Sequence, residues 1–299
     1  MKVIWAEKHR PNDLTGLMGQ QHLKPEMGEI MSGNSQMQHY IFYSREPGTG
    51  KTTLAYMMAN ALGYQIHKYN ASSKKQRGIE FIEEEIALIA RSGQNEVIIL
   101  LDEADQLTPA AQSALKGVIE DSTCFFILTC NDLSKVSPWL QSRCQVRTFE
   151  PVPLDEMQIQ LACICAKEQV ELNDVSIKTI ATRHEGDMRN AIGALQAYAS
   201  LPDNQKEQSL NSISIPTLDS KTFLKLVFKE KDIHEAYTLL LSAPPRQAVR
   251  QIFLFAMQSA AAVENKLKVI DASVQTERDL INGVDEGIAL YNFVNMMIA

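Results

Sequence analysis

The sequence of 299 residues predicts an α/β domain with a parallel β-sheet and helices on both faces, followed by two helical domains. Three observations support this fold class. Short apolar runs alternate with helical segments from residue 39 to residue 150, as in strand–helix–strand units. The runs 97–101 and 125–129 are apolar almost throughout, as expected of strands buried on both faces. After residue 153 the strand pattern stops and helical periodicity takes over.

The segments before and after the predicted sheet have weaker or purely helical signals. Residues 1–35 are expected to form an N-terminal arm with one or two short helices, since Pro11 ends any helix begun before it. Residues 154–200 are expected to be helical, with Asp187 as the cap of their last helix. The apolar face of that helix comprises Met188, Ala191, Ile192, Leu195 and Tyr198. The predicted strands are 39–44, 65–71, 97–102, 124–131 and 146–150.

The C-terminal third begins with a change of composition. The polar segment 201–209 predicts a linker, and the stretch after it, rich in Ser, Asn and Pro, predicts a loop to about residue 220. Residues 220–299 are expected to be helical again, with long apolar-rich runs at 247–263 and 280–298. The sequence therefore predicts three domains, which span residues 1–152, 153–202 and 203–299.

Composition restricts the functions open to the chain. Its net charge is −7, so nucleic acid would be contacted only through a local basic surface. No apolar run is long enough to span a bilayer, and the N-terminus becomes charged too soon for a signal peptide, so no membrane partner is expected. The five cysteines include no C-x-x-C pair, which favours reduced thiols in a cytoplasmic protein.

A glycine-rich turn between the first predicted strand and a helical run indicates a phosphate-binding loop. Gly48 and Gly50 allow close approach of the backbone, and free N–H groups at a helix start attract negative charge. Lys51 is expected to reach the outer phosphates of a nucleotide, and the Thr52 hydroxyl to hold Mg²⁺. Arg45 replaces the usual first glycine, and a plain glycine turn with a surface lysine is the alternative. The loop comprises Pro47, Gly48, Thr49, Gly50, Lys51, Thr52 and Thr53.

Polar residues follow two of the predicted buried strands. Asp102 is expected to bind Mg²⁺ through water opposite Thr52, while Glu103 would orient and polarise the attacking water. Burying a carboxylate at the end of a strand costs free energy unless a cation pairs with it or the protein needs it for function. Asn131 ends the next strand, where it could hold the attacking water beside the γ-phosphate. Each feature alone also suits an ordinary turn, so the prediction depends on their combination with the phosphate loop.

Taken along the chain, these motifs resemble those of AAA+ ATPases of the sliding-clamp loader family, of the replication factor C small-subunit type and its bacteriophage counterparts. The resemblance covers about residues 1–200, and the last third matches only in being helical. It implies a P-loop ATPase domain, a small helical lid and a helical collar that joins subunits. The matching segments are 5–11, 47–53 (Walker A), 102–105 (Walker B), Asn131 (sensor 1), the Ser-Arg-Cys motif 142–144 and 186–191 (sensor 2).

The resemblance assigns roles to single residues. Arg10 and Pro11 belong to the opening segment, which would lie against the adenine of ATP. Arg143 would be an arginine finger that reaches the γ-phosphate held by a neighbouring subunit, and Arg189 would reach the γ-phosphate of its own subunit from the lid. Without the motifs around them, both would be interpreted as ordinary exposed arginines. The implied catalytic set is Lys51, Glu103, Asn131, Arg143 and Arg189, acting on ATP with Mg²⁺.

A basic segment is the candidate contact for the DNA backbone. Ser73 and Gln76 have the spacing of a capping box, so a helix is expected to open there. The span 47–79 contains no acidic residue and includes Lys68 near this helix start. The alternative interpretation is a solvated basic turn. The predicted DNA-binding residues are Ser73, Lys74, Lys75, Arg77 and Thr108.

Thr108 is included because it begins a second helix near the predicted metal site. Thr108 and Pro109 have the pattern of a cap followed by an N1 proline. Gln112 and Lys116 on that helix would relay DNA contact to Glu103, as the resemblance implies.

These features predict the ATPase subunit of a clamp loader, which opens the processivity clamp of a DNA polymerase and places it on primer–template DNA. The expected partners are other loader subunits in a pentameric homo- or hetero-oligomer, the sliding clamp, and the DNA backbone. The alternatives are another AAA+ DNA motor of branch-migration or initiation type, a helicase, and a non-hydrolysing structural subunit. Residues 220–299 show no basic recognition helix, which argues against an initiator, and intact Lys51 and Asp102 argue against a subunit without hydrolysis.

Overall fold

A computed structural model describes residues 4–93, 95–184, 186–202, 206, 218–241, 243, 245–259 and 261–298. It divides the chain into two compact units, Met1–Ile213 and Ser214–Ala299. The linker predicted at 201–209 and the loop predicted after it lie largely outside the described residues. No helix formed by the described residues is long and apolar enough to cross a membrane.

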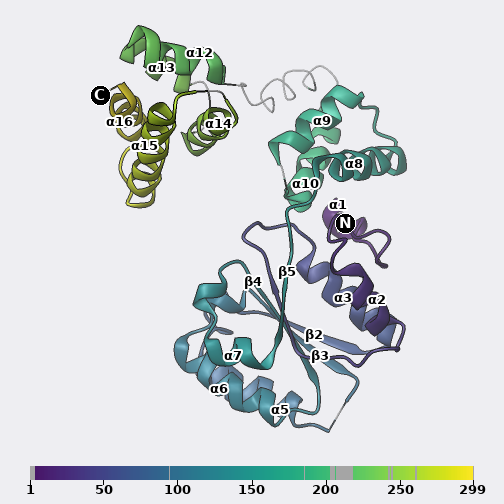
Figure 1. The fold of residues 1–299 in the computed structure, drawn as a ribbon. Helices are drawn as coiled ribbons and strands as arrows, with labels where there is room; N and C mark the ends of the chain where they lie inside the picture. The colour runs from purple at the N-terminus through teal and green to yellow at the C-terminus, as the bar shows by residue number, and fades with distance from the viewer. Residues whose placement is uncertain are drawn as a thin grey trace. The chain divides into compact units, whose positions relative to one another are not determined.

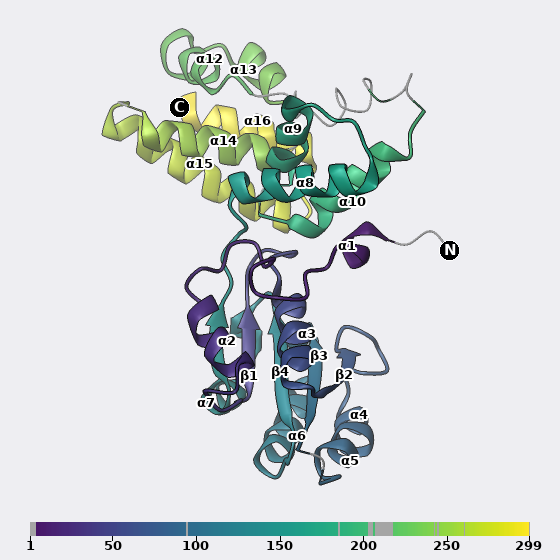
Figure 2. The same cartoon turned by 90° about the vertical axis from the view of Figure 1, so that its right-hand side faces the viewer.

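Among the described residues, the first unit contains one five-stranded sheet in the order β2-β3-β4-β1-β5 (Figures 1 and 2). All four neighbouring pairs are parallel. The prediction of a parallel α/β sheet is therefore confirmed, with a strand at each of the five predicted positions. The strands are β1 (Tyr40–Tyr43), β2 (Gln65–Asn70), β3 (Val97–Asp102), β4 (Phe125–Cys130) and β5 (Gln145–Thr148).

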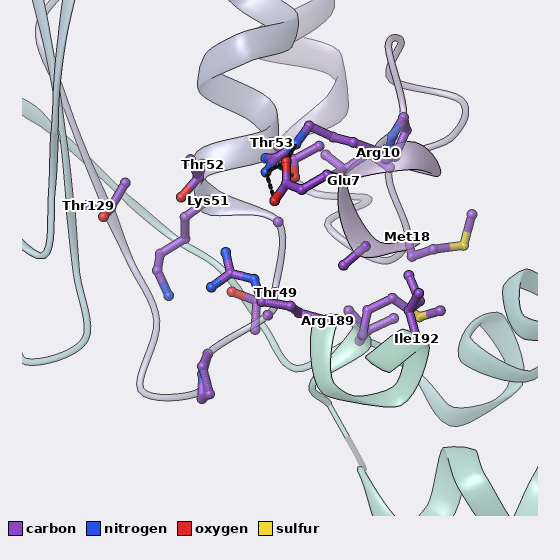
Figure 3. A pocket seen from close by; sticks show the side chains of 18 of the residues that line it. Glu7, Arg10, Met18, Thr49, Lys51, Thr52, Thr53, Thr129, Arg189 and Ile192 are labelled. Carbon is purple, nitrogen blue, oxygen red and sulfur yellow. Dashed lines mark hydrogen bonds and ion pairs between the residues drawn. The ribbon is translucent and has the colours of Figure 1, made fainter. Parts of the chain in front are cut away.

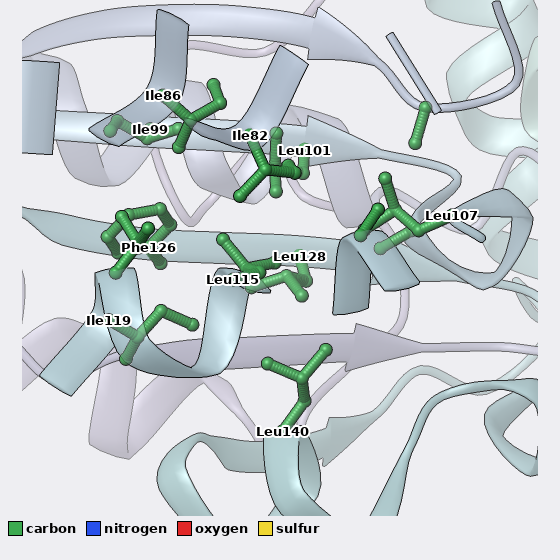
Figure 4. Packing of buried hydrophobic residues seen from close by; sticks show 14 of the residues in the cluster. Ile82, Ile86, Ile99, Leu101, Leu107, Leu115, Ile119, Phe126, Leu128 and Leu140 are labelled. Atoms are coloured by element: carbon green, nitrogen blue, oxygen red, sulfur yellow. The ribbon is translucent and has the colours of Figure 1, made fainter. Parts of the chain in front are cut away.

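Alternate side chains of β3 pack on opposite faces of the sheet. Ile98 and Leu100 belong to the core formed with α2 (Lys24–Met31) and α3 (Lys51–Leu62). Ile99 and Leu101 belong to the core on the other face, which Figure 4 shows. Because both faces are covered, β3 has an uninterrupted apolar sequence. The helices of that other face are α4 (Ile79–Phe81), the π-helical turn η1 (Ile82–Ile86), α5 (Ala87–Ala90), α6 (Pro109–Glu120) and α7 (Pro138–Arg143).

The register of the sheet brings several strand ends to one edge. Tyr43 at the end of β1 pairs with Cys130 at the end of β4. Asp102 at the end of β3 pairs with Asn70 at the end of β2. The segments that leave these strands therefore start at the same edge, which is where open α/β sheets bind ligands. Two short 3₁₀ turns follow there, η2 (Ala104–Gln106) and η3 (Leu133–Lys135).

Three helices after β5 bury a separate apolar cluster and are called the lid helices below. The predicted cap of the third helix is confirmed, because Asp187 accepts a hydrogen bond from the Asn190 N–H at 3.0 Å. All five residues of its predicted apolar face are buried. The lid helices are α8 (Leu154–Glu168), α9 (Asp174–Arg183) and α10 (Met188–Ala199).

The N-terminal arm packs against the lid helices through α1 (Trp5–Lys8). The backbone N–H of Trp5 donates to Gln196 Oε1 on α10 at 2.9 Å. His9 Nε2 lies 2.5 Å from Glu168 Oε1 at the end of α8, and the Lys8 ammonium lies 2.6 Å from the same oxygen. The arm is thus attached to two of the three lid helices.

The second unit is helical in all its regular described segments, as predicted. Its core includes Phe223 and Phe293, whose rings stack with centroids 6.2 Å apart. The division into helices differs from the predicted runs, because a mostly polar helix begins where the run 247–263 ends. The helices are α12 (Ser220–Lys225), the π-helical turn η4 (Leu226–Glu230), α13 (Ile233–Leu240), α14 (Pro245–Gln258), α15 (Val263–Ile281) and α16 (Glu286–Ile298).

Leu100→Ala is expected to lower the free energy of unfolding of the first unit by about 2–5 kcal/mol, because it leaves a cavity where a fully buried side chain of β3 had been. Leu88→Ala is the matched control, since Leu88 is 74% exposed on α5, and its effect should stay within about 0.5 kcal/mol. Urea unfolding of the full chain followed by tryptophan fluorescence measures both, since Trp5 and Trp139 lie in the first unit. Equal shifts for the two variants would contradict the packing described here.

Candidate nucleotide-binding site

The loop between β1 and α3 has the conformation of an anion-binding turn. Gly48 and Gly50 have φ angles of +68° and +101°, a region that side chains other than glycine rarely adopt. Gly50 is the N-cap of α3, so the free N–H groups of the first helical turn face the loop. The Thr49 hydroxyl is buried and has no hydrogen-bond partner in the described part of the chain, which leaves a donor for a bound group.

Lys51 is the first residue of α3 and is largely buried. Its ammonium donates to Asn131 Oδ1 at 2.9 Å and to the Glu46 carbonyl at 3.2 Å. Burial lowers the pKa of Lys51, because the charged ammonium loses water there. A phosphate would restore the lost stabilisation, so the environment of Lys51 suits an anionic ligand.

Asp102 is surrounded by hydroxyl donors and one ammonium. Its Oδ1 accepts from Thr129 Oγ1 at 2.5 Å and from Thr52 Oγ1 at 3.1 Å, and its Oδ2 lies 2.9 Å from Lys68 Nζ. Burial alone would raise the pKa of Asp102, but the hydrogen bonds from Thr129, Lys68 and Thr52 outweigh it and lower the pKa. Asp102 is therefore held as a carboxylate next to the Thr52 hydroxyl.

These two side chains fit the predicted Mg²⁺ site. Thr52 and Asp102 offer a hydroxyl and a carboxylate side by side, which are ligands that Mg²⁺ prefers. The described residues contain no group of three or more His, Cys, Asp or Glu side chains able to hold a metal ion. A site with one carboxylate matches the usual way in which proteins hold Mg²⁺ with nucleotide phosphates and water.

Glu103 follows Asp102 in the left-handed conformation, with φ +59°. Its N–H donates to Thr129 Oγ1 at 3.1 Å, so the same threonine holds both acidic residues. Glu103 lines the pocket together with Asn131. A left-handed residue other than glycine is uncommon, and this conformation presents Glu103 at the pocket wall.

One pocket joins the phosphate loop to the N-terminal arm and α10 (Figure 3). Lys51, Thr52 and Thr129 lie at one end, whereas Met18 and Ile192 lie at the other. The second end is formed by the apolar side chains of Met18 and Ile192, and the other apolar residues of the pocket lining are Ala6, Pro11, Leu17, Val152 and Met188. A polar end and an apolar end in one cavity match the phosphates and the base of a nucleotide.

Arg10 connects the arm to the phosphate-loop helix. Its guanidinium donates to Thr53 Oγ1 at 3.2 Å and lies 5.2 Å from the centre of the Tyr56 ring. It also forms an ion pair with Glu7, whose pKa is lowered by the hydrogen bond from Arg10. Arg10 and Pro11 both line the pocket, where the sequence analysis expects the base.

The lid reaches the phosphate loop through the start of α10. Arg189 lines the pocket and is directed toward the same space as Lys51 (Figure 3). Asp187 packs against Gly48 so closely that an added Cβ at Gly48 would collide with the Asp187 carboxylate. Lid and loop are therefore in van der Waals contact, and glycine is required at this point.

Arg143 is the one predicted catalytic residue that does not line the pocket. It ends α7 and forms an ion pair with Glu120 at the end of α6. Its Nη1 also lies 3.5 Å from the Trp139 carbonyl oxygen. The structure therefore brings Lys51, Glu103, Asn131 and Arg189 together and leaves Arg143 apart from them.

The predicted DNA-binding residues form one exposed segment and one adjoining cap. Lys74, Lys75 and Arg77 lie in the segment after β2, where the two lysines and Ser73 are exposed and Arg77 is at the surface as well. The Thr108 N–H donates to the Arg77 carbonyl at 3.0 Å, which joins that segment to the start of α6. Thr108 caps α6 as predicted, since its hydroxyl accepts from the Ala111 N–H at 3.2 Å.

The prediction that a helix begins at Ser73 is wrong, because α4 begins only at Ile79. The Gln76 side chain accepts from the Asn70 N–H at 2.9 Å instead of capping a helix. Asn70 Oδ1 accepts from the Ser72 N–H, also at 2.9 Å. These local bonds satisfy the turn, which is the usual way in which such side chains compete with a helix.

The partners of Gln112 and Lys68 could not be predicted from the sequence. The Gln112 side chain is buried, donates to the Leu107 and Lys135 carbonyls and accepts from the Ser137 N–H, so it holds loops together and does not contact DNA directly. Lys68 is exposed on β2 and pairs with Asp102.

Several residues of the site could not be predicted from the sequence. Thr129 binds Asp102 and the Glu103 N–H, and the only signal in the sequence is a polar residue inside an apolar strand. Leu17, Met18 and Val152 line the pocket, and nothing in their local sequence marks them. Only the fold brings these three apolar residues together.

The geometry defines a P-loop nucleotide-binding domain of α/β type that is followed by three helices. Residues 41–152 match the family described as ATPase family associated with various cellular activities (AAA). The chain is 30% identical to the replication factor C small subunit of Archaeoglobus fulgidus, over 96% of this chain and 94% of that protein. It is 35% identical to the replication factor C small subunit of Haloarcula marismortui, over 71% and 67% of the two chains. The chain therefore belongs to the replication factor C small-subunit family of AAA ATPases.

Solved structures also share the fold. The RuvB Holliday junction branch migration motor of Thermotoga maritima aligns with a TM-score of 0.59 and 20% identity, over 77% of this chain and 85% of that one. A single-residue variant of the same RuvB protein aligns with a TM-score of 0.60 and 19% identity, over the same shares of the two chains. At this level of identity the similarity shows a common fold, in agreement with the predicted AAA+ architecture.

Gly48→Ala is expected to weaken nucleotide binding by at least about tenfold, since its Cβ would push Asp187 and the lid away from the loop. Gly63→Ala is the matched control. Gly63 also has a positive φ, +71°, but an added Cβ there meets nothing within 4 Å. Titration of a fluorescent ATP analogue measures both affinities. Equal losses in the two variants would mean that backbone strain, and not the contact with the lid, determines binding.

Proposed function

We propose that this chain is an ATPase subunit of a sliding-clamp loader, which uses ATP to open a DNA polymerase clamp and place it on primer–template DNA. The observation that carries the proposal is one pocket that brings Lys51, Glu103 and Asn131 together in a member of the replication factor C small-subunit family. In this pocket Lys51 contacts Asn131, and Thr52 contacts Asp102. The proposed division into an ATPase domain (1–152), a lid (153–202) and a collar (203–299) follows the same resemblance.

The residues of the pocket have complementary tasks in ATP hydrolysis. Lys51 binds the outer phosphates, and the loop N–H groups orient them. Glu103 accepts a proton from the attacking water, which Asn131 helps to place. Thr52 and Asp102 would hold Mg²⁺, which would neutralise phosphate charge when bound. Arg189 binds the γ-phosphate from the lid helices, so the position of these helices depends on the bound nucleotide.

Arg143 acts on the nucleotide of a neighbouring subunit. Its position at the end of α7, outside its own pocket, supports a role in trans. A finger supplied by a neighbour makes hydrolysis depend on assembly, since each site is completed by the next subunit. We therefore propose that the chain works in a pentameric loader, together with copies of itself or with related subunits.

DNA binds through its backbone at the segment after β2 and at the start of α6. The basic side chains of Lys74, Lys75 and Arg77, with the Thr108 cap joined to them, support this surface. Contacts to phosphates give affinity that falls with salt and tolerates any sequence. The protein is expected to act in the cytoplasm, on DNA of the cell or of an infecting virus.

ATP turnover tests the proposal directly. We expect the rate per subunit to rise with protein concentration and to rise again with primer–template DNA and clamp, because neighbouring subunits and DNA complete the site. A low rate indifferent to concentration, DNA and clamp would contradict it and would favour a structural subunit that only lends Arg143 to a partner. A rate stimulated by branched DNA but indifferent to clamp would favour a branch-migration motor.

Arg143→Ala is expected to keep ATP binding and to lower turnover in the assembled complex by about 10³-fold or more, because the transition state loses a charge supplied in trans. Arg91→Ala is the matched control, since Arg91 pairs with Asp121 next to Glu120 and is equally outside the pocket. Binding of a fluorescent ATP analogue and steady-state phosphate release measure the two effects. Unchanged turnover in Arg143→Ala would remove the trans role.

The double variant Lys74→Gln with Lys75→Gln is expected to weaken DNA binding and to reduce the slope of log affinity against log salt by about 1 for each phosphate that the protein no longer neutralises. Lys167→Gln with Lys178→Gln removes two exposed charges from the lid helices and serves as the control. Fluorescence anisotropy of labelled primer–template DNA over a range of salt concentrations gives both slopes. If the two double variants behave alike, overall charge and not this segment governs DNA binding.

A further inference from the structure

Lys68 occupies an unexpected place in the nucleotide site. It lies on β2, two residues before the strand ends at Asn70, and its ammonium reaches 2.9 Å from Asp102 Oδ2. The Lys68 side chain is 37% exposed and that of Asp102 is 19% exposed, so the pair is partly shielded from water. The exposed Lys74 and Lys75 follow a few residues later in the chain.

The carboxylate of Asp102 divides its two oxygens between different partners. Oδ1 accepts hydrogen bonds from the neutral hydroxyls of Thr52 and Thr129. Oδ2 faces the ammonium of Lys68, which is the cation in direct contact with Asp102 among the described residues. Because an unpaired carboxylate in a shielded site is costly, Lys68 supplies the charge that stabilises Asp102 in this arrangement.

We propose that Lys68 is a positioning residue that acts as a resident counter-cation of Asp102 and competes with Mg²⁺ for that carboxylate. The inference rests on the proposed ATP site but goes beyond it, because it concerns how tightly Mg²⁺ is required. Two cations that share one carboxylate repel each other, so each weakens the binding of the other by the same factor. Lys68 thus holds Asp102 in place during nucleotide exchange and raises the Mg²⁺ concentration needed for binding.

A purely structural role would be different. β2 and β3 already pair in register along six residue pairs, from Gln65 with Val97 to Asn70 with Asp102, so the sheet does not depend on this ion pair. If Lys68 only joined the two strands, its removal would change stability and leave the Mg²⁺ requirement as it was.

The test is a Mg²⁺ titration of fluorescent ATP-analogue binding by the full chain, without DNA or clamp. In Lys68→Met the half-saturating Mg²⁺ concentration is expected to fall by at least about fivefold, because the competing charge is gone. Lys68→Gln, which can still donate a hydrogen bond to Asp102, should show the same fall and covers the case in which the methionine variant does not fold. Lys68→Arg keeps the charge and should retain the wild-type requirement.

Lys135→Met is the control for removal of an ion-paired lysine elsewhere in the unit. Lys135 pairs with Asp132 at 3.4 Å and is mostly exposed, so its removal should leave the Mg²⁺ titration unchanged. A second readout needs no nucleotide: Mg²⁺ alone should raise the melting temperature of Lys68→Met more than that of the wild type, since a ligand stabilises the state that binds it better.

An unchanged or increased half-saturating Mg²⁺ concentration in Lys68→Met and Lys68→Gln, with nucleotide binding intact, would overturn the role of Lys68. A fall of the same size in Lys135→Met would also overturn it, because the effect would then be one of net charge. Failure of the wild-type chain to bind the nucleotide analogue would instead contradict the proposed ATP site.

Discussion

Two opposite charges at the carboxyl edge of a sheet with apolar central strands determine how the first unit is built. Lys51 and Asp102 are both shielded from water, so each needs polar partners, and the partners come from separate segments of the chain. Lys51 donates hydrogen bonds to Asn131 and to the Glu46 carbonyl. Asp102 accepts hydrogen bonds from Thr52 and Thr129 and forms an ion pair with Lys68. Because these partners follow or belong to different strands, the charges can be satisfied only when the parallel register is complete.

Features with a local physical cause could be predicted from the sequence. The apolar run of β3 predicts a strand covered on both faces, and Asp187 and Thr108 predict caps, since a cap needs only neighbouring N–H groups. The phosphate loop was predictable for the same reason, because glycines, lysine and threonine adjoin one another in the chain. The assembly of Lys51 with Asn131 followed from the topological rule that parallel strand ends meet at one edge.

Features that depend on distant contacts could not be predicted. The basic residue Lys68 looks like its neighbours in the sequence. In the register of β2 against β3 it pairs with Leu100, and only its long side chain reaches Asp102, two residues further along β3. Ser73 and Gln76 have the spacing of a capping box, but the Asn70 N–H is an equally good partner for Gln76 and the turn forms instead. The apolar lining of the pocket combines residues from the arm, the segment after β5 and α10, which no local pattern connects.

The N-terminal arm spans a joint within the first unit. At one end Trp5, Lys8 and His9 are attached to the lid helices, and at the other Arg10 is attached to the helix of the phosphate loop. The two sets of attachments adjoin each other in the chain, so the arm links the lid helices to the phosphate-loop helix α3 over a few residues. Any displacement of the lid helices relative to α3 would have to break one of these bonds or bend the arm.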